Sequence, residues 1–204
     1  MIKILKSMLA VFTVFAFVTP VNVDAATKVQ TVEEGSVISL SEGKKVSSLS
    51  ALLTSEAELD DWFEVGNLRV TKVQKDVFHI DEGTEENPTR SLLERDLNNG
   101  SSMYLIVDGN EAVLIDGGNS ASTNRGFSDD NNENLRKILD ELVYGPGREF
   151  QVIIAHQHGD HIGAFIVDTV IEKGTPMYIH EDDYSGIKKV TAIYDVDTFK
   201  QGDV

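Results

Sequence analysis

Hydrophobic and polar positions alternate in short runs over residues 67–115. The runs 68–71 and 77–80 are separated by a Lys-Asp turn, and the runs 103–107 and 112–115 are separated by Asp-Gly-Asn. Alternation with a period of two is typical of half-buried strands, and Asp-Gly between two such runs is a strong signal for a hairpin turn. This part of the chain is therefore predicted to form antiparallel hairpins.

The pattern changes after residue 130. Apolar residues recur at helical spacing over 135–143, and the Gly-Pro-Gly shortly after them is expected to end that helix. We then expect a strand over 150–155 that is buried on both faces, a helix over 161–173, a strand over 176–180 and one or two strands over 190–204. Strands that alternate with helices after an antiparallel start predict an α/β fold class.

The N-terminal part is expected to be a targeting signal. Residues 1–25 hold a positive start, an apolar run over 8–18 and small residues before a cut after Ala25, which are the marks of a cleavable secretory signal peptide. The apolar run is shorter than the roughly 20 residues that a membrane-spanning helix needs. We therefore expect a secreted or extracytoplasmic protein with no stable membrane anchor after cleavage.

Two further segments come after the signal peptide. Residues 26–65 form a lead-in segment rich in Ser, Glu, Gly and Lys, with one helix-like stretch over 48–63. Residues 66–204 hold the strand and helix patterns and are predicted to form the main domain.

Composition narrows the function. Asp and Glu number 34 against 18 Lys and Arg, so the net charge is −16, and such a surface repels a phosphate backbone. A nucleic acid partner is thus not expected. The chain has no cysteine, which excludes disulfides, thiolate zinc sites and a cysteine nucleophile.

Three of the five histidines lie within six residues, in the string His156-Gln-His158-Gly-Asp160-His161 that comes after the apolar strand. Side chains two residues apart in an extended chain point the same way, so His156 and His158 can bind one metal ion. Asp160 and His161 lie past the bend at Gly159, where they can face a second ion. Imidazole and carboxylate groups suit zinc, and also iron or manganese.

This string resembles the H-x-H-x-D-H signature of the metallo-β-lactamase superfamily of hydrolases. An Asp-Gly-Gly turn after a hairpin precedes the signature in that family, and here Asp116-Gly117-Gly118 stands in the same order. The resemblance covers about residues 67–204. It implies the αββα fold of the superfamily, of which this chain holds the N-terminal half.

The resemblance also implies the roles of the residues. His156 and His158 would bind a first zinc ion, Asp160 and His161 a second one, and Asp160 is assigned a catalytic role as well. Asp116 would be an outer carboxylate that orients a metal ligand, although a plain turn residue is the alternative. A metal-bound hydroxide would attack an ester, thioester, lactone, lactam or phosphodiester bond of a small-molecule substrate.

The chain departs from the family after His180. The later histidines of the family have no counterpart, since His180 is the last histidine, and both it and His79 are interpreted as surface residues. The alternative function is therefore a truncated, non-catalytic fragment that binds metal weakly and needs a missing C-terminal half. The N-terminal half of the αββα fold alone would expose the apolar face of its sheet, and self-association through that face is expected.

Overall fold

The computed structural model describes residues 43–82, 101–119 and 130–200. The predicted signal peptide lies outside these ranges. Within the described residues, no helix is both long and apolar enough to cross a lipid bilayer.

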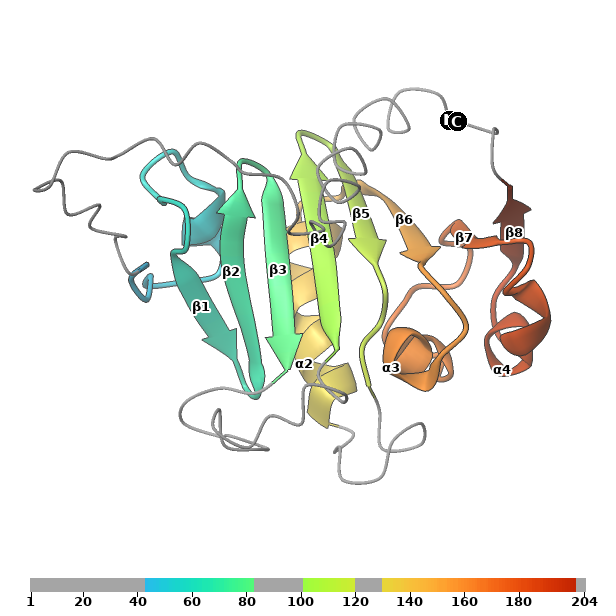
Figure 1. Ribbon diagram of the computed structural model, residues 1–204. Helices are drawn as coiled ribbons and strands as arrows, with labels where there is room; N and C mark the ends of the chain where they lie inside the picture. The colour runs from blue at the N-terminus through green and yellow to red at the C-terminus, as the bar shows by residue number, and fades with distance from the viewer. Residues whose placement is uncertain (1–42, 83–100, 120–129, 201–204) are drawn as a thin grey trace, which may run out of the picture. The chain divides into compact units, whose positions relative to one another are not determined.

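In the described residues, eight strands form one mixed sheet whose spatial order is the order of the chain (Figure 1). The strands are β1 (Trp62–Val65), β2 (Leu68–Gln74), β3 (Val77–Glu82), β4 (Ser102–Asp108), β5 (Glu111–Ile115), β6 (Glu149–Ile154), β7 (Met177–His180) and β8 (Val196–Phe199). The pairs from β1 to β5 are antiparallel, and those from β5 to β8 are parallel. The predicted α/β class and both predicted hairpins are confirmed.

The helical elements are mostly short. They are η1 (Ser50–Leu53), α2 (Asp130–Leu139), the π-helical turn η2 (Asp140–Tyr144), α3 (Gly159–Ile162), η3 (Gly163–Phe165), η4 (Tyr184–Gly186) and α4 (Lys188–Thr191). The helix predicted from the apolar spacing over 135–143 is confirmed as α2 and η2. The chain leaves this helix at Gly145-Pro146-Gly147, where Gly147 has a positive φ of 71°.

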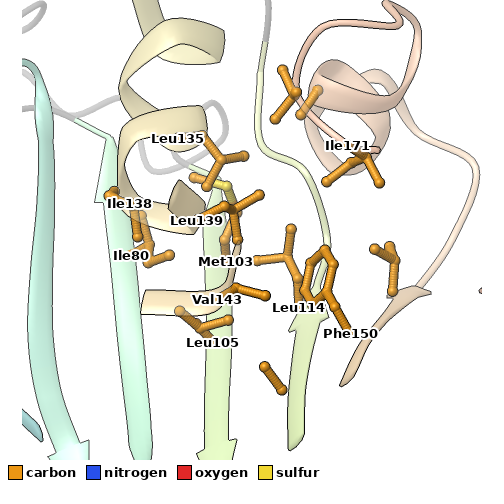
Figure 2. Close-up of a cluster of buried hydrophobic side chains, with 14 of the residues drawn as sticks. Ile80, Met103, Leu105, Leu114, Leu135, Ile138, Leu139, Val143, Phe150 and Ile171 are labelled. Atoms are coloured by element: carbon orange, nitrogen blue, oxygen red, sulfur yellow. The ribbon is translucent and has the colours of Figure 1, made fainter. Parts of the chain in front are cut away.

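The core lies between α2 and one face of the sheet. Figure 2 shows Leu135, Ile138 and Leu139 of α2 directed at Ile80 and Met103 of the sheet. All five side chains are at most 2% exposed. Burial of one apolar face against a helix layer is the main term that stabilises such a sheet.

The described part of the predicted lead-in segment also joins this sheet. Lys45 bridges to Trp62, and Leu49 and Leu52 are buried in the core. The helix expected over 48–63 is wrong beyond the four residues of η1. The backbone of the turn before β1 is instead held by Asp61, whose carboxylate accepts the N–H groups of Lys44 and Glu58.

Two other expectations for the parallel part need correction. The helix expected over 161–173 ends at Phe165, because the N–H groups of Gly163 and Ala164 bond to the Asp-Gly-Gly turn instead of to helical carbonyls. The strand β6 is buried on one face only, since Gln151 and Ile153 are half-buried. After residue 190, where one or two strands are predicted, the described residues hold the end of α4 and the strand β8, so one predicted strand is confirmed.

Candidate metal centre

The predicted histidine string begins shortly after the end of β6. His156 to His158 form a non-helical segment, and Gly159–Ile162 turn into the short helix α3. This edge of the sheet carries the carboxyl ends of the parallel strands, where ligands commonly bind in open α/β sheets.

The structure brings the three imidazoles together. The ring centres of His156 and His158 are 4.5 Å apart, and those of His156 and His161 are 3.8 Å apart. The carboxylate of Asp160 lies beside the same cluster, with Oδ2 3.5 Å from Nε2 of His161. In their present positions, no three His, Asp or Glu side chains of the described residues form a ready-made metal cage.

Asp116 lies next to this cluster and holds two of its parts. Its Oδ2 lies 2.7 Å from Nδ1 of His161, and its Oδ1 accepts the backbone N–H of Ala155 at 2.7 Å. A carboxylate only accepts hydrogen bonds, so the proton of the neutral His161 ring sits on Nδ1. The nitrogen that remains able to bind a metal is then Nε2. This carboxylate–histidine pairing is the usual outer arrangement around a metal ligand.

The backbone of the turn is bonded to the histidine segment as well. Gly117 donates its N–H to the carbonyl of His161 at 2.7 Å, and Asp116 donates to the carbonyl of Ile153 at 2.9 Å. Gly117 has no room for a side chain, because an added Cβ would lie 2.8 Å from the ring of Phe165. Asp116 itself has a positive φ of 65°, a conformation that Asp tolerates better than most residues.

Other neighbours of the site have no signal in the sequence. The hydroxyl of Ser101 donates to the carbonyl of Asp160, and Asp183 accepts the N–H of Gln157 at 3.4 Å. Gly186 lies against the side chain of Gln157, so that a Cβ there would overlap it. These contacts join residues that are far apart along the chain and follow no recognisable spacing.

The remaining two histidines lie elsewhere. His79 is half-buried on β3, bonded to Ser102 and packed against the ring of Tyr104. His180 ends β7, where its ring contacts Phe199 and its Nδ1 lies 3.5 Å from Asp182. The neighbours of these two rings thus differ from those of the cluster around His161.

Protonation differs within the histidine cluster. Burial and then the neighbouring imidazoles of His161 and His158 lower the pKa of His156 below 6.5. Burial also acts to lower the pKa of His161, but the hydrogen bond to Asp116 and the charges of Asp116 and Asp160 outweigh it and raise that pKa above 6.5. Between these two rings, the metal-free cluster therefore takes up a proton first on His161.

A second buried carboxylate lies behind the turn. Glu82, at the end of β3, accepts the backbone N–H and the side-chain N–H of Asn119 at 2.7 and 2.8 Å. Burial raises the pKa of Glu82 to about 7, against the opposing effect of its hydrogen bonds. No motif in the sequence points to Glu82 or Asn119.

The part of the chain that holds the site matches a known family. The family model of the metallo-beta-lactamase superfamily covers residues 98–193, which include the Asp116 turn and the histidine string. The family prediction is confirmed. No curated protein matches the chain.

Solved metallo-beta-lactamases are similar to this chain at low identity. The DIM-1 metallo-beta-lactamase is 13% identical, with a TM-score of 0.43 over 67% of this chain and 53% of its own. An enzyme from Erythrobacter litoralis with beta mercaptoethanol in its active site is 12% identical, with a TM-score of 0.46 over 68% and 52%. FIM-1 from Pseudomonas aeruginosa, in its mono-zinc form, is 11% identical, with a TM-score of 0.41 over 64% and 49%. This chain thus spans about half the length of each.

The opposite pKa directions predict the order in which the two rings titrate in the metal-free protein. We expect His161 to titrate at a higher pH than His156, and Asp116→Asn to lower the pKa of His161, because the amide carries no charge. Side-chain NMR titration measures both. Equal titration of the two rings, or an unchanged His161 in the variant, would contradict the geometry of the pair.

Glu82 predicts a pH dependence of stability. The pKa of Glu82 in the folded protein is about 7, above its ordinary value of 4.5. Its contribution to the free energy of unfolding is therefore fully present below pH 4.5 and is lost as the pH rises through 7. The free energy of unfolding of the wild type should therefore fall between pH 4.5 and 8. We expect this fall to be smaller by on the order of 1–3 kcal/mol in Glu82→Gln. Denaturant melts between pH 4.5 and 8 measure it.

The matched control is Glu64→Gln. Although burial acts to raise the pKa of Glu64, hydrogen bonds and charges from Lys45 and Arg69 leave it lowered. The contribution of Glu64 to stability is therefore lost as the pH falls into the acid range. Glu64→Gln should change stability at acid pH and leave the fall toward neutral pH as in the wild type. A Glu82→Gln protein with the wild-type pH profile would refute the assignment.

Proposed function

We propose that this protein is an exported, zinc-dependent hydrolase of the metallo-beta-lactamase superfamily. The observation that carries the proposal is the pairing of Asp116 with Nδ1 of His161 beside the rings of His156 and His158. Three imidazoles and a carboxylate are a donor set that suits zinc. His156 and His158 would hold one ion, and Asp160 and His161 a second.

The bound zinc would supply Lewis-acid polarisation of the scissile bond and activation of water for hydrolysis. The residues of the chain would position the metal ligands. Asp116 fixes the proton of His161 on Nδ1 and holds the ring in place, with its own charge shielded from water. The hydrogen bond from Ala155 to the same carboxylate fixes the start of the histidine segment.

Small-molecule substrates with an ester, thioester, lactone, lactam or phosphodiester bond are the proposed class. The net charge of −16 argues against long polyanions such as nucleic acids. The alternative is a non-catalytic fragment that binds metal weakly. It is supported by the origin of the four proposed ligands, which all come from one six-residue segment.

Zinc binding tests the site itself. We expect the purified chain to bind zinc, His158→Ala to lose this binding, and Asp116→Ala to weaken it about 10- to 100-fold. Competition with a chromophoric chelator measures the affinity. His79→Ala is the control, because His79 lies on β3 and bonds to Ser102.

A substrate panel then separates the two functions. Turnover that needs both zinc and His158 supports the hydrolase, whereas zinc binding without turnover supports the fragment. Wild-type zinc affinity in His158→Ala would refute both.

The proposed export rests on residues 1–25 alone. Mass spectrometry of the exported protein should find Ala26 at the N-terminus, because the small residues before it suit signal peptidase. An exported chain that still begins at Met1 would contradict this part of the proposal.

A further inference from the structure

The turn that carries Asp116 is held at its far end by Glu82. Asn119, the third residue after Asp116, is 1% exposed and gives both its backbone and its side-chain N–H to the two oxygens of Glu82. Gly118 lies so close that an added Cβ would stand 2.7 Å from Oε1 of Glu82. The carboxylate is therefore in direct contact with the turn.

A chain of buried amides leads from Glu82 to a cation. Oε1 of Glu82 also accepts Nδ2 of Asn131 at 3.2 Å, the carbonyl oxygen of Asn131 accepts from Asn67, and that of Asn67 accepts from Asn134 at 2.7 Å. The carbonyl oxygen of Asn134 accepts from the ammonium group of Lys137 at 3.3 Å.

Every amide in this chain has the same orientation. Each one accepts on the side of Lys137 and donates on the side of Glu82, so the dipoles align between the cation and the anion. Aligned hydrogen bonds polarise one another, which favours a buried negative charge at Glu82. The chain anchors that charge to α2, which carries Asn131, Asn134 and Lys137.

The four-residue turn has little freedom to absorb a change at one end. Gly117 is packed against Phe165, and Gly117 and Gly118 accept hydrogen bonds from Ala164 and Gly163. A shift of Asn119 therefore moves Asp116, and with it the bond to Ala155.

We propose that Glu82 is a positioning residue of the metal centre, acting through Asn119 to hold Asp116 in place for His161 and Ala155. Its relevance to metal binding rests on the proposed function. Its effect on Asp116 does not, because that effect exists in the metal-free protein.

Amide hydrogen exchange of the metal-free chain tests this directly. Ala155 is solvent-exposed, so the protection of its N–H depends on the bond to Asp116. We expect Glu82→Ala to speed exchange at Ala155 about tenfold and to leave Val152, which bonds to Pro176, unchanged. Glu82→Gln should restore protection, because its oxygen still accepts from Asn119 and its amide can donate to a rotated Asn119.

Leu52→Ala is the matched control, because Leu52 is a fully buried core residue of η1, and none of the hydrogen bonds of the turn described above involves η1. An unprotected Ala155 in the wild type, an unchanged Ala155 in Glu82→Ala, or equal losses at Ala155 and Val152 would overturn the proposal. Should Glu82→Ala fail to fold, Asn119→Ala decides in its place, since it removes one of the two bonds and should speed exchange at Ala155 about threefold. An unchanged Ala155 there would also overturn the proposal.

Zinc affinity is the second measurement. We expect Glu82→Ala to weaken zinc binding about tenfold at a temperature where Leu52→Ala binds normally. A wild-type chain that takes up no zinc would refute the proposed function, while the exchange result at Ala155 would still decide the role of Glu82.

Discussion

The hydrogen bonds of Asp116 are the constraint on which the site depends. This single carboxylate joins the end of β5 to the start and the end of the histidine segment, because it binds both Ala155 and His161. The imidazoles themselves contribute little cohesion, since neighbouring rings repel one another once charged. The scaffold therefore supplies the order that the histidines lack, as expected for a preorganised site.

This order is costly to build. A charged side chain is placed on a residue in the left-handed conformation, and two adjacent glycines admit no side chain against Phe165 and Glu82. A second carboxylate is buried directly beside them, although burial disfavours its charge. Expensive local geometry of this kind is commonly found at functional sites, where the rest of the fold compensates for it.

The elements whose signals are local could be predicted from the sequence. The hairpin turn at Asp108-Gly109, the apolar face of α2 and the histidine string can each be recognised in a few consecutive residues. The short helix at Gly159–Phe165 could not be predicted, because its end is decided by backbone bonds to a turn more than 40 residues earlier. The role of Glu82 could not be predicted for the same reason: an acidic residue at a strand end has no local signal, and its role depends on Asn119 and Asn131, which are folded against it.

Over the described residues, the spatial order of the strands equals their order in the chain, so that each of the eight strands lies beside its predecessor. Such a topology permits the sheet to grow by one strand at a time from its N-terminal end, because each new strand pairs with one that has already formed. The hairpin of β4 and β5, which ends at the Asp116 turn, would then form before the histidine segment packs against it.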